Sequence, residues 1–159
     1  MLKTLAIALV LLSGYLLFRE LKRTWEMGVS QCEEFLRFIR HVKEKVTAYS
    51  SPSSEWGIGF HSDELLNCGF LSGGGFNTQK DYFLYDKRLF IPDKEREMLS
   101  SFFSEKSSLS LELEIKRING FELDFEESCL KLRDNVAKRV KSWGVIIASS
   151  ALGIAILLL

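Results

Sequence analysis

The chain has 159 residues, of which 47% are hydrophobic and 26% charged, and its formal net charge is zero. That balance does not indicate a general nucleic-acid partner, because such proteins carry an excess of Lys and Arg. The length suffices for one domain of modest size once long apolar runs are set aside. Charge is also segregated, since no acidic residue occurs in the first nineteen or the last twenty-five positions.

The first run, Thr4 to Phe18, is uncharged and rich in Leu. Its fifteen residues are short for a membrane span and typical of a signal-peptide core. No small-x-small cleavage pattern follows it, so the interpretation that we favour is an uncleaved N-terminal transmembrane helix over residues 1–19. Cleavage of this segment stays open as the alternative.

Residues 21–46 place apolar side chains at alternating steps of four and three, which puts them on one helix face. The seam has one gap, at Gly28. Leu36 and Phe38 widen the stripe, which favours packing in an antiparallel helical bundle over a narrow dimeric coiled coil. We expect the helix to end before Pro52, which removes a backbone donor.

The middle of the chain gives fewer signals. Ser62 before two acidic residues and two leucines predicts a short capped helix that ends at Gly69. The run of three glycines at 73–75 is expected to be a flexible connection. The dense aromatic segment 82–91 predicts short helical or irregular structure packed on the long helices, with a small hairpin as an alternative. A further helix is expected to follow Pro92 and to carry Phe102 and Phe103.

The last third predicts one long helix. Residues 111–142 have apolar positions on a spacing of three and four, and we expect Phe35 and Ile39 to pack against Ile118, Phe125 and Leu132. Residues 143–159 carry no charge, which predicts a C-terminal transmembrane helix. The predicted layout is therefore a transmembrane helix at 1–19, a helical bundle at 20–142 and a second transmembrane helix at 143–159.

Cations stand at the inner end of both apolar runs, and the positive-inside rule then assigns the segment between them to the cytoplasm. These cations are Arg19, Lys22, Arg23, Lys138, Arg139 and Lys141. They are explained by topology and by lipid headgroups before any other ligand is needed. Membrane lipids are accordingly the first partner that we expect.

Three widely spaced cysteines form neither a disulfide framework nor a metal-ligand pattern. Cys32 and Cys129 fall on the apolar faces of predicted helices, where we expect reduced thiols that act as small hydrophobic side chains. That usage suits a reducing compartment.

No catalytic, cofactor or metal site is predicted. His41 and His61 have no partner at metal-binding spacing, the adjacent Glu126 and Glu127 are interpreted as a solvated pair, and the Ser-rich stretches lack a nucleophile elbow. An enzyme is therefore not expected. The weak candidates for partner binding are charged residues on the bundle, namely Arg37, Arg40, Arg96 and Lys106. For each of them a solvated face is the alternative.

The layout resembles stage III sporulation protein AB of endospore-forming bacteria, whose soluble part is similar to the cytoplasmic domains of type II secretion protein F. Residues 33–39, the helix end near Pro52 and residues 138–159 carry most of the resemblance, while the segment 56–90 departs from the family pattern. The resemblance implies an all-α antiparallel bundle between two membrane helices. It also implies a platform protein in the channel apparatus between mother cell and forespore, in the outer forespore (mother-cell) membrane, together with a cytoplasmic secretion-type ATPase and other membrane subunits. A homo-oligomer is compatible with it.

Two functions from different classes compete. The first is a non-enzymatic assembly component, or adaptor. The second is a membrane-anchored sensor or signalling protein, in which the middle segment recognises a ligand. A helix-only bundle without a cleft would favour the adaptor, and a formed pocket would favour the sensor.

Overall fold

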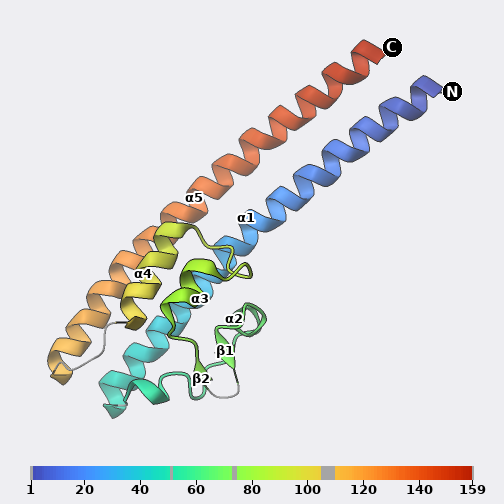
Figure 1. The fold of residues 1–159 in the computed structure, drawn as a ribbon. Coiled ribbons are helices and arrows are strands. Elements are labelled where there is room, and N and C mark those ends of the chain that lie inside the picture. The colour runs from blue at the N-terminus through green and yellow to red at the C-terminus, as the bar shows by residue number, and fades with distance from the viewer. Residues whose placement is uncertain (1, 51, 73–74, 105–109, 159) are drawn as a thin grey trace. The chain divides into compact units, whose positions relative to one another are not determined.

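A computed structural model describes residues 2–50, 52–72, 75–104 and 110–158 of the chain (Figure 1). In chain order, the elements in these ranges are α1 (Leu2–Tyr49), the 3-10 turn η1 (Ser53–Glu55), α2 (Asp63–Asn67), β1 (Leu71–Ser72), β2 (Gly75–Phe76), α3 (Lys80–Tyr85), α4 (Asp93–Ser104) and α5 (Leu111–Leu158). The two long helices, α1 and α5, have 48 residues each.

The chain divides into two compact units. The helix-pair unit consists of residues 1–26 and 132–159, which are the N-terminal part of α1 and the C-terminal part of α5. The bundle unit consists of residues 27–131 and contains every short element. Both long helices thus contribute one part to each unit.

The expectation of two transmembrane helices is wrong. Among the described residues, no helix is long and apolar enough to cross a membrane. Charged residues limit both apolar runs: Arg19 and Glu20 end the first after fifteen uncharged residues, and Lys141 precedes the second. A span needs about 20 predominantly apolar residues. The fold is therefore not a bundle between two membrane-spanning helices, and it also contains a two-stranded sheet.

The predicted helix ends in the first half of the chain are confirmed. α1 ends at Tyr49, where Ser50 has a positive φ of 50° and donates its backbone N–H to the carbonyl of Val46 over 3.1 Å. The N-cap of α2 is Ser62, whose hydroxyl accepts the backbone N–H of Leu65. Gly69, at φ 82°, follows this helix, in the left-handed conformation that glycine adopts without strain.

The middle segment differs from the expectation in one place. Strands β1 and β2 form an antiparallel pair in which Leu71 lies opposite Phe76, so Gly75 belongs to a strand, whereas the sequence predicts a flexible connection over 73–75. Residues 73 and 74 lie outside the described part of the chain. The aromatic segment after it forms α3 followed by a turn, as the expectation of short helical or irregular structure has it. Burial explains the hairpin, because Phe76 contacts the rings of Phe38 and Phe70 inside the bundle unit.

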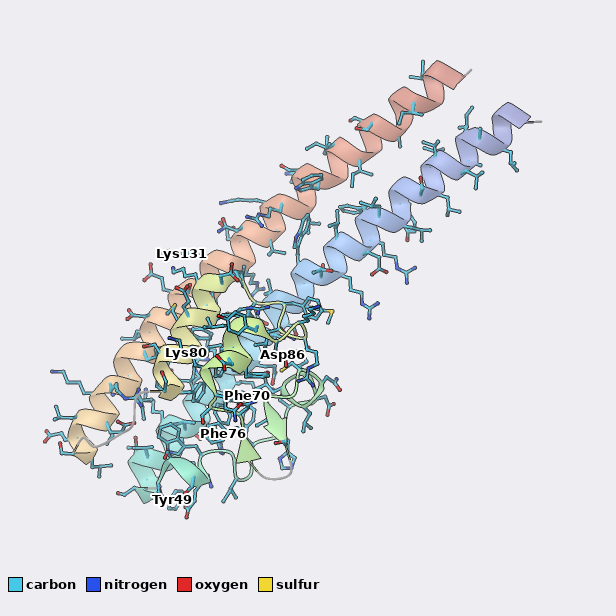
Figure 2. The ribbon with its side chains drawn as sticks, viewed as in Figure 1. Tyr49, Phe70, Phe76, Lys80, Asp86 and Lys131 are labelled. Atoms are coloured by element: carbon cyan, nitrogen blue, oxygen red, sulfur yellow. A yellow bond between two sulfur atoms is a disulfide. The ribbon has the colours of Figure 1, made fainter. Side chains whose placement is uncertain are left out.

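An aromatic core fills the bundle unit. The largest fully buried side chains include five phenylalanines, Phe35, Phe38, Phe70, Phe83 and Phe125. Figure 2 shows side chains from several elements gathered around Phe70 and Phe76. The predicted burial is confirmed for Phe35, Ile39, Ile118 and Phe125, which are all 0% exposed. Leu132 is half-buried and belongs to the helix-pair unit.

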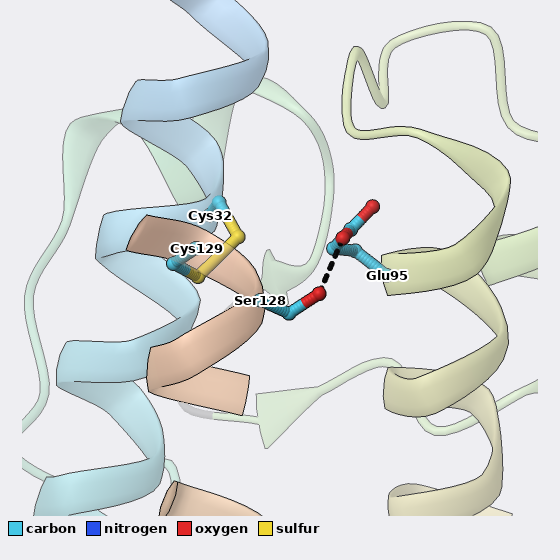
Figure 3. Close-up of a disulfide and its surroundings, with 4 residues drawn as sticks. All are labelled: Cys32, Glu95, Ser128 and Cys129. Atoms are coloured by element: carbon cyan, nitrogen blue, oxygen red, sulfur yellow. Dashed lines mark hydrogen bonds between the residues drawn. A yellow bond between two sulfur atoms is a disulfide. The ribbon is translucent and has the colours of Figure 1, made fainter. Parts of the chain in front are cut away.

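Cys32 on α1 and Cys129 on α5 form a disulfide (Figure 3). The predicted position of both sulfurs on buried helix faces is confirmed, but the predicted reduced state is wrong. The register of the two helices brings the Cα atoms within 6.0 Å, inside the range that a disulfide requires. Cysteine usage therefore no longer supports a reducing compartment. The third cysteine, Cys68, is a buried free thiol.

Candidate functional site

Arg37 is the most exposed of the predicted partner-binding residues that the structure describes. Its side chain is 58% exposed and pairs with Glu34 over 2.6 Å, one turn earlier on α1. The guanidinium also donates to the carbonyl of His61 and lies 5.3 Å from the centre of the Phe60 ring. Arg37 thus holds the segment before α2 against α1 while most of its surface stays open to solvent.

Arg40 connects the two long helices. Its guanidinium contacts Glu122 and Glu126 on α5 over 3.1 and 2.8 Å, and Lys43 contacts Glu122 over 2.8 Å. Hydrogen bonds to Glu126 and Glu122 raise the pKa of Arg40. Burial alone would raise the pKa of Glu122, but the hydrogen bonds from Lys43 and Arg40 outweigh burial and lower it. This cation cluster has its counter-charges within the chain.

Arg96 on α4 binds the chain's own backbone. Its Nε donates to the carbonyl of Ile91 over 2.9 Å, and Nη2 donates to the carbonyl of Leu89. Nη1 lies 3.3 to 3.4 Å from three further carbonyls, those of Phe83, Leu84 and Asp86. The guanidinium therefore holds the turn between α3 and α4 in place through hydrogen bonds to its backbone carbonyls. The fourth candidate, Lys106, lies outside the described residues.

Gln31 on α1 holds the same turn from the other side. Its amide donates to the carbonyl of Arg88 and accepts the backbone N–H of Phe90 over 2.9 and 2.7 Å. Next to it, a Cβ on Gly28 would lie 2.6 Å from the carbonyl oxygen of Phe90. The glycine gap in the helical seam is therefore the position where backbone packs on backbone. The sequence shows the gap at Gly28 but does not show that the backbone of Phe90 packs there.

A cavity of about 630 Å³ opens in the bundle unit between the hairpin, η1 and the end of α4. Trp56 is stacked on Phe76 and Phe102, with ring centres 6.5 and 6.3 Å away. The described lining residues are uncharged: Ser53, Ser54, Trp56, Gly75, Phe76, Thr78, Gln79, Phe102, Phe103 and Ser104. This cavity has aromatic walls and a rim of hydroxyl and amide groups. The density of aromatic residues was its only sequence signal.

The helix-pair unit exposes a large apolar surface. Its two segments pack through small residues and rings: Gly14 lies against Ile147, Gly144 against the Phe18 ring, and the rings of Trp25 and Trp143 are 6.4 Å apart. Side chains that do not face the partner helix remain exposed, among them Leu5, Leu9, Leu12, Tyr15, Leu17, Val145, Ile146, Leu152 and Ile156. Soluble monomers rarely expose contiguous apolar surface of this kind without an interaction partner.

Among the described residues, no group of three His, Cys, Asp or Glu side chains is placed to hold a metal ion. The buried carboxylate of Glu95 accepts a hydrogen bond from the Ser128 hydroxyl over 2.6 Å, close to the disulfide (Figure 3). That bond satisfies a buried acid and joins α4 to α5.

Comparison of the chain with family models, with curated proteins and with solved structures finds no match.

Proposed function

We propose that the chain is a non-enzymatic adaptor that attaches to a membrane surface through the helix-pair unit and presents the bundle unit to protein partners. One observation carries this proposal: the same two helices build two units of opposite surface chemistry. The helix-pair unit exposes apolar side chains over most of its length, whereas the bundle unit buries most of its large apolar side chains in an aromatic core.

Lipid is the partner that best explains the helix-pair unit. Exposed leucine, isoleucine and valine side chains lose contact with water when they enter the boundary between headgroups and acyl chains, which contributes roughly 25 cal/mol per Å². Trp25 and Trp143 lie beside the cationic end of these segments, as amphipathic rings do at a membrane interface.

The bundle unit is the part suited to hold a protein partner. Its core is packed, a disulfide joins its two long helices, and its exposed face carries charged residues such as Arg37. By the resemblance to stage III sporulation protein AB, the partners would be a secretion-type ATPase and other subunits of a channel apparatus between mother cell and forespore. The same resemblance would put the bundle on the cytoplasmic side, whereas the disulfide between Cys32 and Cys129 is typical of an oxidising compartment.

The test is co-purification of the full chain with its partners. The tagged chain is cross-linked in the cells that make it, the membrane fraction is solubilised, and co-purified proteins are identified by mass spectrometry. We expect the chain in the membrane fraction together with a hexameric ATPase. Recovery of the chain in the soluble fraction, or from membranes without any ATPase, would contradict the adaptor.

A matched pair of variants locates the contact. Arg37→Glu reverses an exposed charge on α1, and Lys116→Glu reverses an exposed charge on α5 as the control. Both variants should keep the helical circular dichroism of the wild type, because exposed ion pairs contribute at most about 1 kcal/mol. We expect Arg37→Glu alone to lower the recovery of the ATPase. Equal recovery from both variants would exclude Arg37 as the contact.

A ligand-binding sensor is a second candidate function, because the bundle unit contains a formed cavity and a sensor needs such a cavity to bind its ligand. The aromatic walls and the hydroxyl rim suit an uncharged ligand with a flat face and hydroxyl groups. Phenyl β-glucoside combines the two features and serves as the probe. In a Trp25→Phe, Trp143→Phe variant only Trp56 fluoresces, and binding should shift its emission. An unchanged emission spectrum up to millimolar probe would count against the sensor.

A further inference from the structure

Six cations of the helix-pair unit lie at one level of the two antiparallel segments. Arg19, Lys22 and Arg23 come from α1, and Lys138, Arg139 and Lys141 come from α5. Two contacts set the level: the Phe18 ring lies 3.4 Å from the Cβ position of Gly144, and the rings of Trp25 and Trp143 are neighbours. At about 1.5 Å of rise per residue, each set of three cations covers only about 6 Å along the helix axis. We call these six residues the cation collar.

Ion pairs divide the collar into two groups. Lys22 pairs with Glu26 and Lys138 pairs with Asp134, each one helical turn away. Arg19, Arg23, Arg139 and Lys141 are exposed, and within the ranges that the structure describes no ion pair or hydrogen bond engages their side chains. Glu20 is the only acidic residue inside the collar. Four cations thus stand without a counter-charge at the edge of an exposed apolar surface.

We propose that the cation collar binds the headgroups of anionic phospholipids, with Arg19, Arg23, Arg139 and Lys141 as the contacting residues. This inference rests on the proposed attachment of the helix-pair unit to a membrane surface and adds its lipid selectivity. Guanidinium groups form paired hydrogen bonds with phosphate oxygens, and each Lys or Arg near an anionic surface strengthens binding. The apolar side chains beyond the collar enter the acyl boundary, while the long cationic side chains stay among the headgroups.

A second copy of the chain is a poorer occupant of this surface. In a parallel symmetric dimer that covered the apolar segments, two collars would approach one another, and like charges at an interface oppose association. In an antiparallel dimer, each collar would lie at the far end of the partner's uncharged run and find no counter-charge there. The first nineteen and last twenty-five residues supply no acid that could balance them. An anionic lipid supplies both the apolar chain and the negative charge that the surface lacks.

The experiment is flotation of the purified full chain with vesicles of phosphatidylcholine alone and with vesicles that also contain phosphatidylglycerol. The test variant changes the four unpaired cations to glutamine (Arg19→Gln, Arg23→Gln, Arg139→Gln, Lys141→Gln). The control variant removes the same amount of charge from exposed lysines of the bundle unit (Lys80→Gln, Lys87→Gln, Lys94→Gln, Lys116→Gln). Size-exclusion chromatography without vesicles reports self-association of each protein.

We expect the wild type and the control to partition more strongly into phosphatidylglycerol vesicles, and salt to weaken that preference. The collar variant should lose roughly 600-fold of its partitioning into these vesicles, because each of the four cations typically contributes about fivefold. It should keep its partitioning into phosphatidylcholine. Equal binding of the wild type to both vesicles, or an equal loss in both variants, would overturn the headgroup inference but leave membrane attachment standing. Absence of any vesicle binding, with or without a stable oligomer, would instead overturn the attachment itself.

Discussion

Gly28 shows how one residue of α1 determines where the turn between α3 and α4 can pack. A Cβ at this position would come within 2.6 Å of the Phe90 carbonyl oxygen, a backbone atom that cannot rotate away. We therefore expect Gly28→Ala to lower the free energy of unfolding by about 1–3 kcal/mol, as overpacking does. The measurement is urea denaturation of the full chain.

Gly120→Ala is the matched control, because Gly120 also lies inside a long helix but has nothing within 4 Å of its Cβ position. Here alanine should stabilise the protein by roughly 1 kcal/mol through its helix propensity. If both substitutions stabilised the chain equally, the packing of the turn against α1 would be wrong.

Arg96 stabilises the fold through several carbonyl groups at once. Arg96→Lys keeps the positive charge, but a single ammonium group replaces the planar set of guanidinium donors. The carbonyls of Leu89 and Ile91 would therefore lose their hydrogen-bond partner. We expect a loss of about 2–3 kcal/mol in the free energy of unfolding. Lys94→Ala, at an exposed position on the same helix, should change it by less than about 0.5 kcal/mol. An Arg96 variant with unchanged stability but weaker partner recovery would instead make Arg96 a contact residue, as the sequence suggested.

At the scale of elements, the disulfide joins the two long helices across a sequence separation of 97 residues. Closing a loop of this length restricts the unfolded chain, so we expect its removal in Cys32→Ala, Cys129→Ala to cost about 2–5 kcal/mol. Dithiothreitol should lower the free energy of unfolding of the wild type by the same amount. It should not change that of the double variant. A wild type whose urea midpoint is insensitive to the reductant would show that the bond does not form.

The ion pairs between α1 and α5 give the bundle unit a pH dependence on the acid side. The pKa of Glu122 in the folded state lies below its ordinary value of 4.5, so the unfolded chain takes up this proton first. The stability contributed by Arg40 and Lys43 is thus present above about pH 4.5 and is lost as the pH falls through the folded-state pKa.

The comparison of wild type with Glu122→Gln isolates this contribution. Since Arg40 and Lys43 are 45% and 40% exposed, we expect a difference of at most about 1 kcal/mol near neutral pH that shrinks below pH 4.5. The free energy of unfolding, measured by urea denaturation at several pH values, reports it. Glu112→Gln, at an exposed position of α5, is the control and should show no such convergence.

Features set by neighbouring residues along the chain could be predicted from the sequence. Features set by the alignment of α1 with α5, or by packing between distant segments, could not. The apolar seam of α1, the cap at Ser62 and the helix end before Pro52 are local patterns, and the structure contains all three. The hairpin around Gly75 forms because Phe76 reaches the core, which the run of glycines did not reveal. Likewise, neither the disulfide nor the pairing of Arg40 with Glu122 can be read before the alignment of α1 with α5 is known.

The candidate site follows the same rule. The cations of the collar were recognised from their place beside apolar runs, but their common level on two antiparallel segments emerged only from the packing of Phe18 on Gly144. The two predicted transmembrane helices are wrong because each uncharged run is too short. Arg19 and Glu20 end the first run and Lys141 precedes the second, so no described helix is long and apolar enough to cross a membrane. Arg96 was selected for its charge, although its environment of carbonyl groups makes it part of the fold.

In the whole molecule, the helix-pair unit is proposed to attach to the membrane and the bundle unit to present a surface to protein partners. These roles make separate demands on the chain. The bundle unit has to keep its fold when the protein binds a membrane, and most of its large apolar side chains are already buried in its own core. The helix-pair unit has to exchange water for lipid along its exposed leucine, isoleucine and valine side chains.

Hydrogen–deuterium exchange of the full chain, with and without phosphatidylglycerol vesicles, tests this division most directly. We expect amides in residues 1–26 and 132–159 to exchange more slowly when vesicles are present, while those in residues 27–131 exchange at unchanged rates. Protection that appeared in residues 27–131 and left both terminal segments unchanged would contradict this division.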